Sequence, residues 1–198
     1  MLPALLLHIS LVLPHTAVLS PAVRAYAIAE AAAIWSGRGV LVDDDEPCSP
    51  TVLTVAVATA PPPGRHGLRP PLAAITFGPD GTPEPRVVVY LSEIQRLLGS
   101  ARFLGLDEAQ WPPSLREELV GRAVGRVLAH EIGHYLLRSR AHTESGLMRS
   151  FQRADDLVGV ARAPFTPAPF GDGFVIASGE TMGESKASAG AGVGRLRR

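Results

Sequence analysis

The feature that most constrains this chain is the pentapeptide His130-Glu131-Ile132-Gly133-His134, which has the pattern H-E-x-x-H. On a helix with about 3.6 residues per turn, two histidines at this spacing lie one above the other on the same face. Two such imidazoles can bind one Zn²⁺ ion from the same side. Glu131 lies about 100° around the helix, where its carboxylate reaches a water molecule on the metal without being a ligand. We therefore expect His130 and His134 to be metal ligands and Glu131 to be a general base.

The residues before the motif predict a long helix that supports it. Ser114-Leu115-Arg116-Glu117 has the pattern of a capping box, with Glu117 at the N3 position. Arg122 and Arg126 are expected toward the edge of the buried stripe of this helix. That stripe contains both histidines of the motif and four apolar residues at helical spacing: Leu119, Ala123, Val127 and Leu137. The pattern predicts a mostly buried helix with H-E-x-x-H in its last turns, where apolar packing holds both imidazoles rigidly.

The part of the chain before this helix alternates between predicted strands and one further main helix. Ser20-Pro21 has the pattern of a helix start, an N-cap hydroxyl followed by proline, and the alanine-rich helix is expected to run to about Trp35. Short apolar or β-branched runs predict five strands, at about 4–13, 40–42, 51–60, 72–77 and 86–91. The expected fold class is α+β: a twisted mixed β-sheet of about five strands packed on two main helices, the second of which carries H-E-x-x-H.

A catalytic zinc site needs a third protein ligand in addition to the two histidines of the motif. The next histidine is His142, eight residues after His134, and it follows a turn at the end of the helix. Glu144, Asp155 and Asp156 are alternative third ligands, because carboxylate oxygens also bind Zn²⁺. Of these candidates, His142 is the one that we expect.

The end of the long helix and the loop after it resemble the metal-binding region of the metzincin-type zinc metallopeptidases. His130, Glu131 and His134 match the H-E-x-x-H of this family. His142 matches its third histidine, and Ser145-Gly146-Leu147-Met148 resembles its Met-turn. The order of strands and helices upstream is similar to the N-terminal half of the metzincin fold. The phrase HEIGHYLLRSRAHTESGLM is also similar to small bacterial predicted metallopeptidases, and the resemblance is strongest over about residues 114–150.

This resemblance implies a hydrolase, namely a zinc-dependent protease that acts as a metalloendopeptidase with one catalytic Zn²⁺ ion. Peptide bonds would be hydrolysed by a zinc-activated water molecule, with Glu131 as the general base. Met148 would lie beneath the metal as a supporting residue. The substrate would be a peptide or a protein, and an extended peptide can pair with an exposed strand edge. We expect residues 86–91 to provide that edge.

The chain departs from the family pattern H-E-x-x-H-x-x-G-x-x-H at two positions. Leu137 stands where the pattern has the glycine that turns the chain, and Arg140 stands where it has the third histidine. Arginine remains protonated and offers no lone pair to a metal, so His142, two residues later, requires a longer turn. The alternative function is a non-catalytic zinc-binding domain with a degenerate peptidase fold. The intact Glu131 argues against this alternative, since a purely structural zinc site has no use for a base.

Composition and charge predict a globular domain without nucleic-acid partners. The 198 residues are 46% hydrophobic and 19% charged with no net charge, so binding through bulk charge is not expected. We expect one zincin-like catalytic domain at 1–178 and a disordered tail at 179–198, where glycine, alanine, serine and arginine predominate. The single cysteine, Cys48, excludes an internal disulfide. We expect the protein to be a monomer.

The apolar run Leu2–Leu13 bears on the localisation of the protein. This run is too short to span a membrane, and no lysine or arginine precedes it as in a signal peptide. Apolar residues alternate with His8 and Ser10, which is the period of a strand. We therefore predict a first strand rather than a signal peptide within residues 1–25. On this basis alone a cytoplasmic location is favoured over a secreted one, and the sequence otherwise leaves the location unknown.

Overall fold

The computed structural model describes residues 7–13, 18–44, 51–62, 70–150 and 153–168. The predicted tail at 179–198, the predicted domain end at 178 and Cys48 lie outside these residues. Among the helices in the described ranges, none combines the length and the apolar character that crossing a membrane requires.

The central sheet has five strands of mixed direction. Its order is β2-β1-β3-β5-β4, in which β1, β2, β3 and β5 run parallel and β4 is antiparallel to β5. The strand bounds are β1 Leu7–Val12, β2 Val40–Asp43, β3 Thr51–Ala58, β4 Ala73–Phe77 and β5 Pro83–Tyr90. The predicted α+β class with a mixed sheet of about five strands is therefore confirmed.

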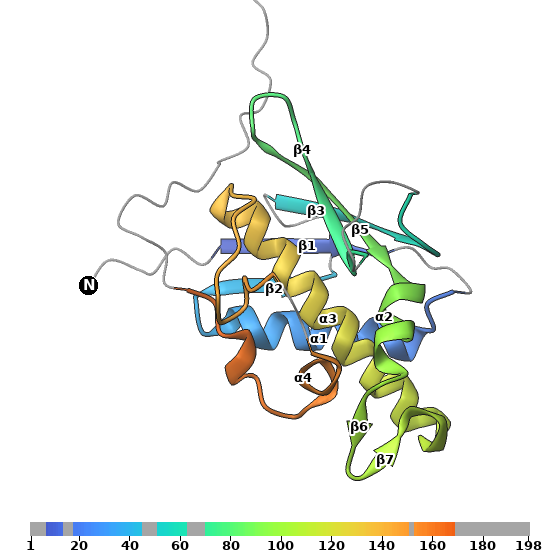
Figure 1. The fold of residues 1–198 in the computed structure, drawn as a ribbon. Coiled ribbons are helices and arrows are strands. Elements are labelled where there is room, and N and C mark those ends of the chain that lie inside the picture. Colours follow the sequence, from blue (N-terminus) through green and yellow to red (C-terminus); the bar gives the residue numbers. More distant parts are fainter. Residues whose placement is uncertain (1–6, 14–17, 45–50, 63–69, 151–152, 169–198) are drawn as a thin grey trace, which may run out of the picture.

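The two main helices pack on one face of this sheet. The helix bounds are α1 Pro21–Ser36, α2 Leu91–Leu98, α3 Pro113–Leu137 and α4 Ala154–Val158. The short strands β6 Arg102–Phe103 and β7 Leu106–Asp107 form a hairpin before α3. α1 contacts β2, and α3 contacts β4 and β5 (Figure 1). Alternate strand residues such as Leu53 and Val87 are buried on the helix side, whereas Arg86 on the other face is exposed.

The main helices approach each other closely because glycines lie on the α1 side of α3, at Gly121 and Gly125. A Cβ atom at Gly125 would lie 2.5 Å from the Ala27 carbonyl oxygen, so no larger residue fits there without a shift of α1. Further along α3, Trp35 Nε1 donates a hydrogen bond to the Ala129 carbonyl oxygen at 3.0 Å. These contacts fix the end of α3, and with it the H-E-x-x-H motif, against the first helix.

The first main helix begins as predicted, and the second does not. Ser20 is the N-cap of α1, and its side chain caps the first turn. α3 begins at Pro113 with Pro112 as its N-cap, so the predicted capping box at Ser114 is wrong. Glu117, the predicted N3 partner in that box, instead accepts a hydrogen bond from the Ser20 hydroxyl at 2.7 Å. A tertiary contact between the starts of the two helices thus replaces the predicted local one.

The outermost strand of the sheet next to α3 is β4, so the prediction that residues 86–91 form a free edge is wrong. Val87 of β5 pairs with Val55 on one side and with Ile75 on the other, which makes β5 an interior strand. Within the described residues, β4 has no strand partner on its outer side. Residues 72–77 and 86–91 are both short apolar runs, and their order in the sheet depends on long-range pairing that local periodicity does not record.

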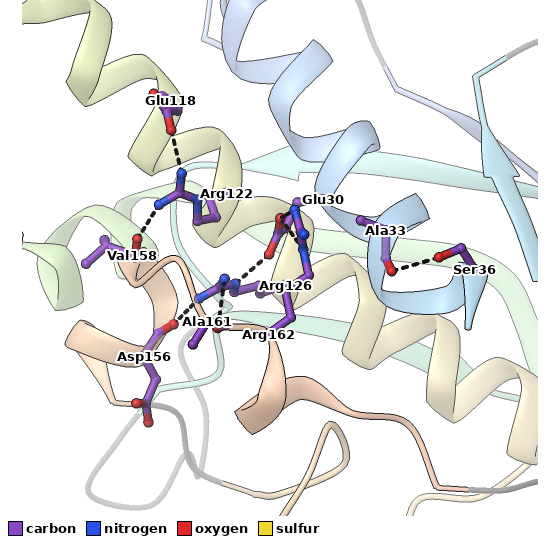
Figure 2. Close-up of polar contacts among 10 residues, drawn as sticks. All are labelled: Glu30, Ala33, Ser36, Glu118, Arg122, Arg126, Asp156, Val158, Ala161 and Arg162. Carbon is purple, nitrogen blue, oxygen red and sulfur yellow. Dashed lines mark hydrogen bonds and ion pairs between the residues drawn. The ribbon is translucent and has the colours of Figure 1, made fainter. Parts of the chain in front are cut away.

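A buried ion-pair network holds the segment 153–168 against α1 and α3 (Figure 2). Arg126 Nε donates to one carboxylate oxygen of Glu30 at 2.8 Å, and Arg162 Nη2 donates to the other at 2.7 Å. Arg126 also donates to two carbonyl oxygens of the segment. The Arg126 side chain is 0% exposed, so the prediction that it lies toward the edge of the buried stripe is wrong. The carboxylate and the carbonyls offset the cost of burying its charge.

Candidate metal centre

The two histidines of the motif lie in the last two turns of α3. The Nε2 atoms of His130 and His134 are 3.0 Å apart, and the two rings meet edge to face with their centroids 4.7 Å apart. Two imidazole nitrogens bound to one tetrahedral Zn²⁺ at about 2.0–2.1 Å are separated by about 3.3 Å. The observed separation is close to this value, so both nitrogens are near the position that two ligands of one ion would take.

Backbone carbonyls hold the other nitrogen of each ring. His130 Nδ1 lies 2.7 Å from the Leu147 carbonyl oxygen, and His134 Nδ1 lies 2.7 Å from that of Ser139. A carbonyl oxygen can only accept a hydrogen bond, so each Nδ1 carries the proton and each Nε2 keeps its lone pair. Histidines that bind metals commonly have their second nitrogen held in this way, which fixes both the tautomer and the orientation of the ring.

His142 joins the two histidines of the helix from the loop that follows it. Its ring centroid lies 5.3 Å from that of His130 and 4.9 Å from that of His134. One ligand nitrogen from each of the three residues lies within 4.8 Å of the other two. The structure thus brings the three predicted ligands close enough together to bind a metal ion. His142 is exposed, which leaves this side of the group open to solvent.

The carboxylates that were alternative third ligands do not belong to this group, which in the described part of the chain consists of histidines alone. Asp155 Oδ1 accepts a hydrogen bond from the Arg102 N–H at 3.0 Å. Asp156 Oδ2 pairs with Arg149 at 2.8 Å. Glu144 is exposed in the loop. Two of the three carboxylates are therefore held by partners elsewhere.

The turn that brings His142 to the group is made at Arg138. α3 continues through Leu137, the position at which the metzincin pattern has its glycine. Arg138 then takes the left-handed conformation, with φ 47° and ψ 40°, and ends the helix. This conformation also directs the Ser139 carbonyl toward the ring of His134. The turn therefore comes one residue later than in the pattern, and His142 lies two residues later than the third histidine of the pattern.

The loop after α3 rests on the hairpin formed by β4 and β5. The Arg140 guanidinium carbon lies 4.7 Å from the centroid of the Phe77 ring, at the end of β4. Arg138 Nη2 donates to the Thr82 hydroxyl at 3.4 Å. Both arginines are exposed. Arg140, which stands where the metzincin pattern has its third histidine, therefore contacts the sheet.

Met148 packs directly against the motif. It is buried, and a Cβ atom at Gly133 would collide with its sulfur atom. The loop that ends in Met148 is closed by a hydrogen bond of 2.8 Å from the Thr143 N–H to the Met148 carbonyl oxygen. This hydrogen bond joins the residue after His142 to the residue after Leu147, so it fixes the positions of His142 and of the Leu147 carbonyl relative to each other.

Glu131 is buried beside the histidines, with 6% of its surface exposed. Burial raises the pKa of its carboxyl group to about 7, and a hydrogen bond from the Ile75 backbone opposes this increase to a smaller extent. Ile75 belongs to β4, so the outermost strand passes next to this carboxyl group. A group that titrates near neutral pH can both accept and return a proton under physiological conditions.

The histidines of the helix are neutral near pH 7. Burial lowers the pKa of His130 to about 4, and repulsion from the rings of His134 and His142 acts in the same direction. Burial likewise lowers the pKa of His134. The hydrogen bonds to Leu147 and Ser139 raise these pKa values but are smaller effects than burial. Neutral imidazoles bind metals without first releasing a proton, so His130 and His134 can bind a cation directly at neutral pH.

Some groups at the site have no signal in the sequence. The carbonyl groups of Leu147 and Ser139 and the N–H of Ile75 belong to the backbone, so their positions depend on the path of the chain and not on the residue type. The left-handed Arg138 also has no signal, because arginine seldom adopts this conformation. The one available sign was the position of His142, two residues later than the third histidine of the metzincin pattern, which predicted a longer turn.

Comparisons with protein-family models, with curated proteins and with solved structures found no match to this chain. The chemistry of the histidine group is therefore the basis for inferring a function.

Proposed function

We propose that this protein is a zinc-dependent metalloendopeptidase of the metzincin type, in which His130, His134 and His142 bind one Zn²⁺ ion. The observation that carries the proposal is the grouping of three imidazole nitrogens within 4.8 Å of one another, next to a buried glutamate. Catalytic zinc sites have three protein ligands and an open position, whereas structural sites have four ligands. The described residues offer no fourth ligand in this group.

The donor set suits zinc. Imidazole nitrogen binds Zn²⁺ and other transition metals, whereas Mg²⁺ and Ca²⁺ take oxygen ligands. The Leu147 and Ser139 carbonyls keep the protons of His130 and His134 on Nδ1 and so leave Nε2 available. A Zn²⁺ ion held there would supply Lewis acidity to a peptide carbonyl group and to a water molecule.

Glu131 is the general base in this proposal. Its carboxylate takes the proton of the attacking water and passes it to the leaving amine nitrogen. A pKa near 7 suits both transfers, because neither the protonated nor the ionised form is strongly favoured at neutral pH. Burial by the surrounding side chains also keeps bulk water from competing for the proton.

The outer side of β4 is the best place for an extended substrate. The Ile75 backbone contacts Glu131, so this strand passes beside the general base. β4 has no outer strand partner in the described part of the chain, and an extended peptide can add to such an edge through its backbone. A peptide bound there would have its backbone next to Glu131. This edge takes the place of residues 86–91 in our proposal.

Metal analysis and a proteolysis assay test this function. The purified protein is expected to contain stoichiometric zinc and to lose it on His130→Ala. It is expected to cleave an unstructured protein such as casein, and a chelator should stop the cleavage. Glu131→Gln should retain zinc and lose cleavage. Zinc without cleavage in the unsubstituted protein would support the non-catalytic zinc-binding alternative, and normal cleavage by Glu131→Gln would rule out the mechanism.

A further inference from the structure

We propose that Arg140 gives the enzyme a preference for peptides that carry an acidic side chain within about three residues of the cleaved bond. This inference rests on the proposed peptidase function and names a substrate class for the same site. It comes from the position of one exposed guanidinium group between the histidine group and the outermost strand of the sheet.

Two observations place Arg140 close to the proposed active site: its contact with Phe77 of β4 and its short distance along the chain from His142. Its guanidinium carbon lies 4.7 Å from the centroid of the Phe77 ring, and Phe77 is two residues along β4 from Ile75, whose backbone contacts Glu131. At about 3.3 Å per strand residue, these two positions of β4 are about 7 Å apart. Arg140 is also two residues before His142, so the Cα atoms of these two residues are at most about 7 Å apart. A peptide on the outer side of β4 would therefore pass the guanidinium close to its cleaved bond.

Among the residues that the structure describes, no carboxylate forms an ion pair with Arg140. Its side chain is exposed, and its contact among the described residues is with the face of the Phe77 ring. Other arginines of the molecule, such as Arg126 and Arg149, pair with carboxylates. The ring restricts the guanidinium without occupying its five N–H donors, which leaves them available to a ligand.

A second arginine adds to the positive charge at this place. Arg138 is exposed on the same loop and donates to the Thr82 hydroxyl, and it also interacts with Asp80. Arg140 is thus the guanidinium that remains for a ligand. A carboxylate is the best match for it in a peptide, because the two planar groups form paired hydrogen bonds. Since the pair is exposed to solvent, we expect a preference of about two- to fivefold.

Matched fluorogenic peptides test this preference. Each pair differs only by glutamate or glutamine at one position, from three residues before the cleaved bond to three residues after it. The enzyme is expected to cleave the glutamate peptide with a kcat/KM about two- to fivefold higher at one or more positions, and high salt should reduce this advantage. Arg140→Gln should equalise the two rates, and Arg140→Glu should favour lysine at the same position.

The matched control is Arg86→Gln, which removes the same charge as Arg140→Gln but on the face of the sheet that points away from the helices. This control should keep the preference for glutamate. A second measurement does not depend on turnover: labelled glutamate peptide should bind the Glu131→Gln protein two- to fivefold more tightly than the glutamine peptide. Adding Arg140→Gln to that protein should remove the difference.

The outcomes separate this inference from the proposed function. Equal rates for glutamate and glutamine peptides at every position, in an enzyme that cleaves them, would overturn the inference and leave the peptidase function standing. A preference that persists in Arg140→Gln would overturn it as well. If no peptide is bound or cleaved, the proposed function fails and the inference fails with it.

Discussion

The sulfur atom of Met148 occupies the space that a side chain at Gly133 would need. Gly133 is part of the H-E-x-x-H motif, so this contact joins the loop after α3 to the turn of the helix that carries the histidines. Leu147, the residue before Met148, supplies the carbonyl group that accepts a hydrogen bond from the ring of His130. The packing of one sulfur atom is therefore connected to the orientation of a candidate metal ligand.

Gly133→Ala is expected to destabilise the metal-free protein by up to about 2 kcal/mol, because overpacking costs about 1–3 kcal/mol and alanine gains about 1 kcal/mol over glycine in a helix. The added Cβ atom would collide with the Met148 sulfur and lie 3.2 Å from the Met148 methyl group. Urea unfolding measures the difference. Zinc affinity should fall in parallel, because a displaced loop moves the Leu147 carbonyl away from His130.

The control for this substitution is Gly37→Ala. Gly37 has a φ of −65° and no atom within 4 Å of an added Cβ, so no loss of stability is expected there. In a Met148→Ala background, Gly133→Ala should cost less than it does in the unsubstituted protein, because the colliding sulfur is gone. An equal cost in both backgrounds would contradict the proposed contact.

Arg138→Gly is expected to stabilise the protein by about 0.5–1 kcal/mol. Arg138 has φ 47°, a left-handed conformation that costs residues with a Cβ about 1–2 kcal/mol and glycine almost nothing. The greater freedom of glycine in the unfolded chain offsets part of this gain. Arg138→Ala loses the same side-chain contact with Thr82 but keeps the strained backbone, so it is the matched control. Thermal unfolding in which both variants behave alike would show that backbone strain is not the cause.

The parts of the fold that could be predicted are those that depend on neighbours in the sequence. Ser20-Pro21 identified the start of α1, because the cap and the proline act within one turn. The strand ranges followed from local periodicity, and His130 and His134 were placed on one helix face by their spacing. The grouping with His142 was also expected, since a loop of a few residues limits how far it can lie from the helix.

The remaining features depend on contacts between distant segments. Glu117 looked like part of a local cap and instead contacts Ser20, which is far away in the sequence. Arg126 looked like a residue at the edge of a buried face and is fully buried, because Glu30 and a later segment supply its hydrogen bonds. The position of β4 at the outside of the sheet is likewise set by pairing between distant strands. Local patterns contain no record of these partners.

Arg126→Met is expected to lower the free energy of unfolding by about 3–5 kcal/mol. Arg126 is fully buried between Glu30 and backbone carbonyls of the segment 153–168, so its removal leaves buried acceptors without donors. Arg122→Met is the matched control on the same helix. Arg122 binds Glu118, which is more exposed, together with one carbonyl group, so about 1 kcal/mol is expected. Equal losses in urea unfolding would show that burial of the Arg126 pair is not decisive.

The stability of the metal-free protein should depend on pH through Glu131. The pKa of this carboxyl group is about 7 in the folded protein, above its ordinary value of 4.5, so the folded state binds the proton more tightly. The resulting stabilisation is present at low pH and is lost as pH rises through 7. In the presence of a chelator, the unfolding free energy of the protein relative to Glu131→Gln should fall by about 2–3 kcal/mol between pH 5 and pH 8.

Comparison with Glu131→Gln is needed because His130 acts in the opposite direction. Its pKa is lowered from 6.5 to about 4, so its contribution to stability is lost as pH falls. Both proteins contain His130, and its effect largely cancels in the difference between them. A difference that is constant from pH 5 to pH 8 would contradict the raised pKa of Glu131.

His142→Ala is expected to weaken metal binding by more than about 100-fold, because it removes one of the three proposed ligands, whereas loss of a supporting contact typically costs about 10–100-fold. Asp155→Ala should leave the affinity unchanged, since Asp155 is held by the Arg102 backbone and lies outside the histidine group. Competition with a chelating dye measures the affinity for Zn²⁺. The spectrum of bound Co²⁺ should also change in His142→Ala, because the number of nitrogen ligands falls. If instead Asp155→Ala released the metal and His142→Ala retained it, the third ligand would be the carboxylate of Asp155 and not the imidazole of His142.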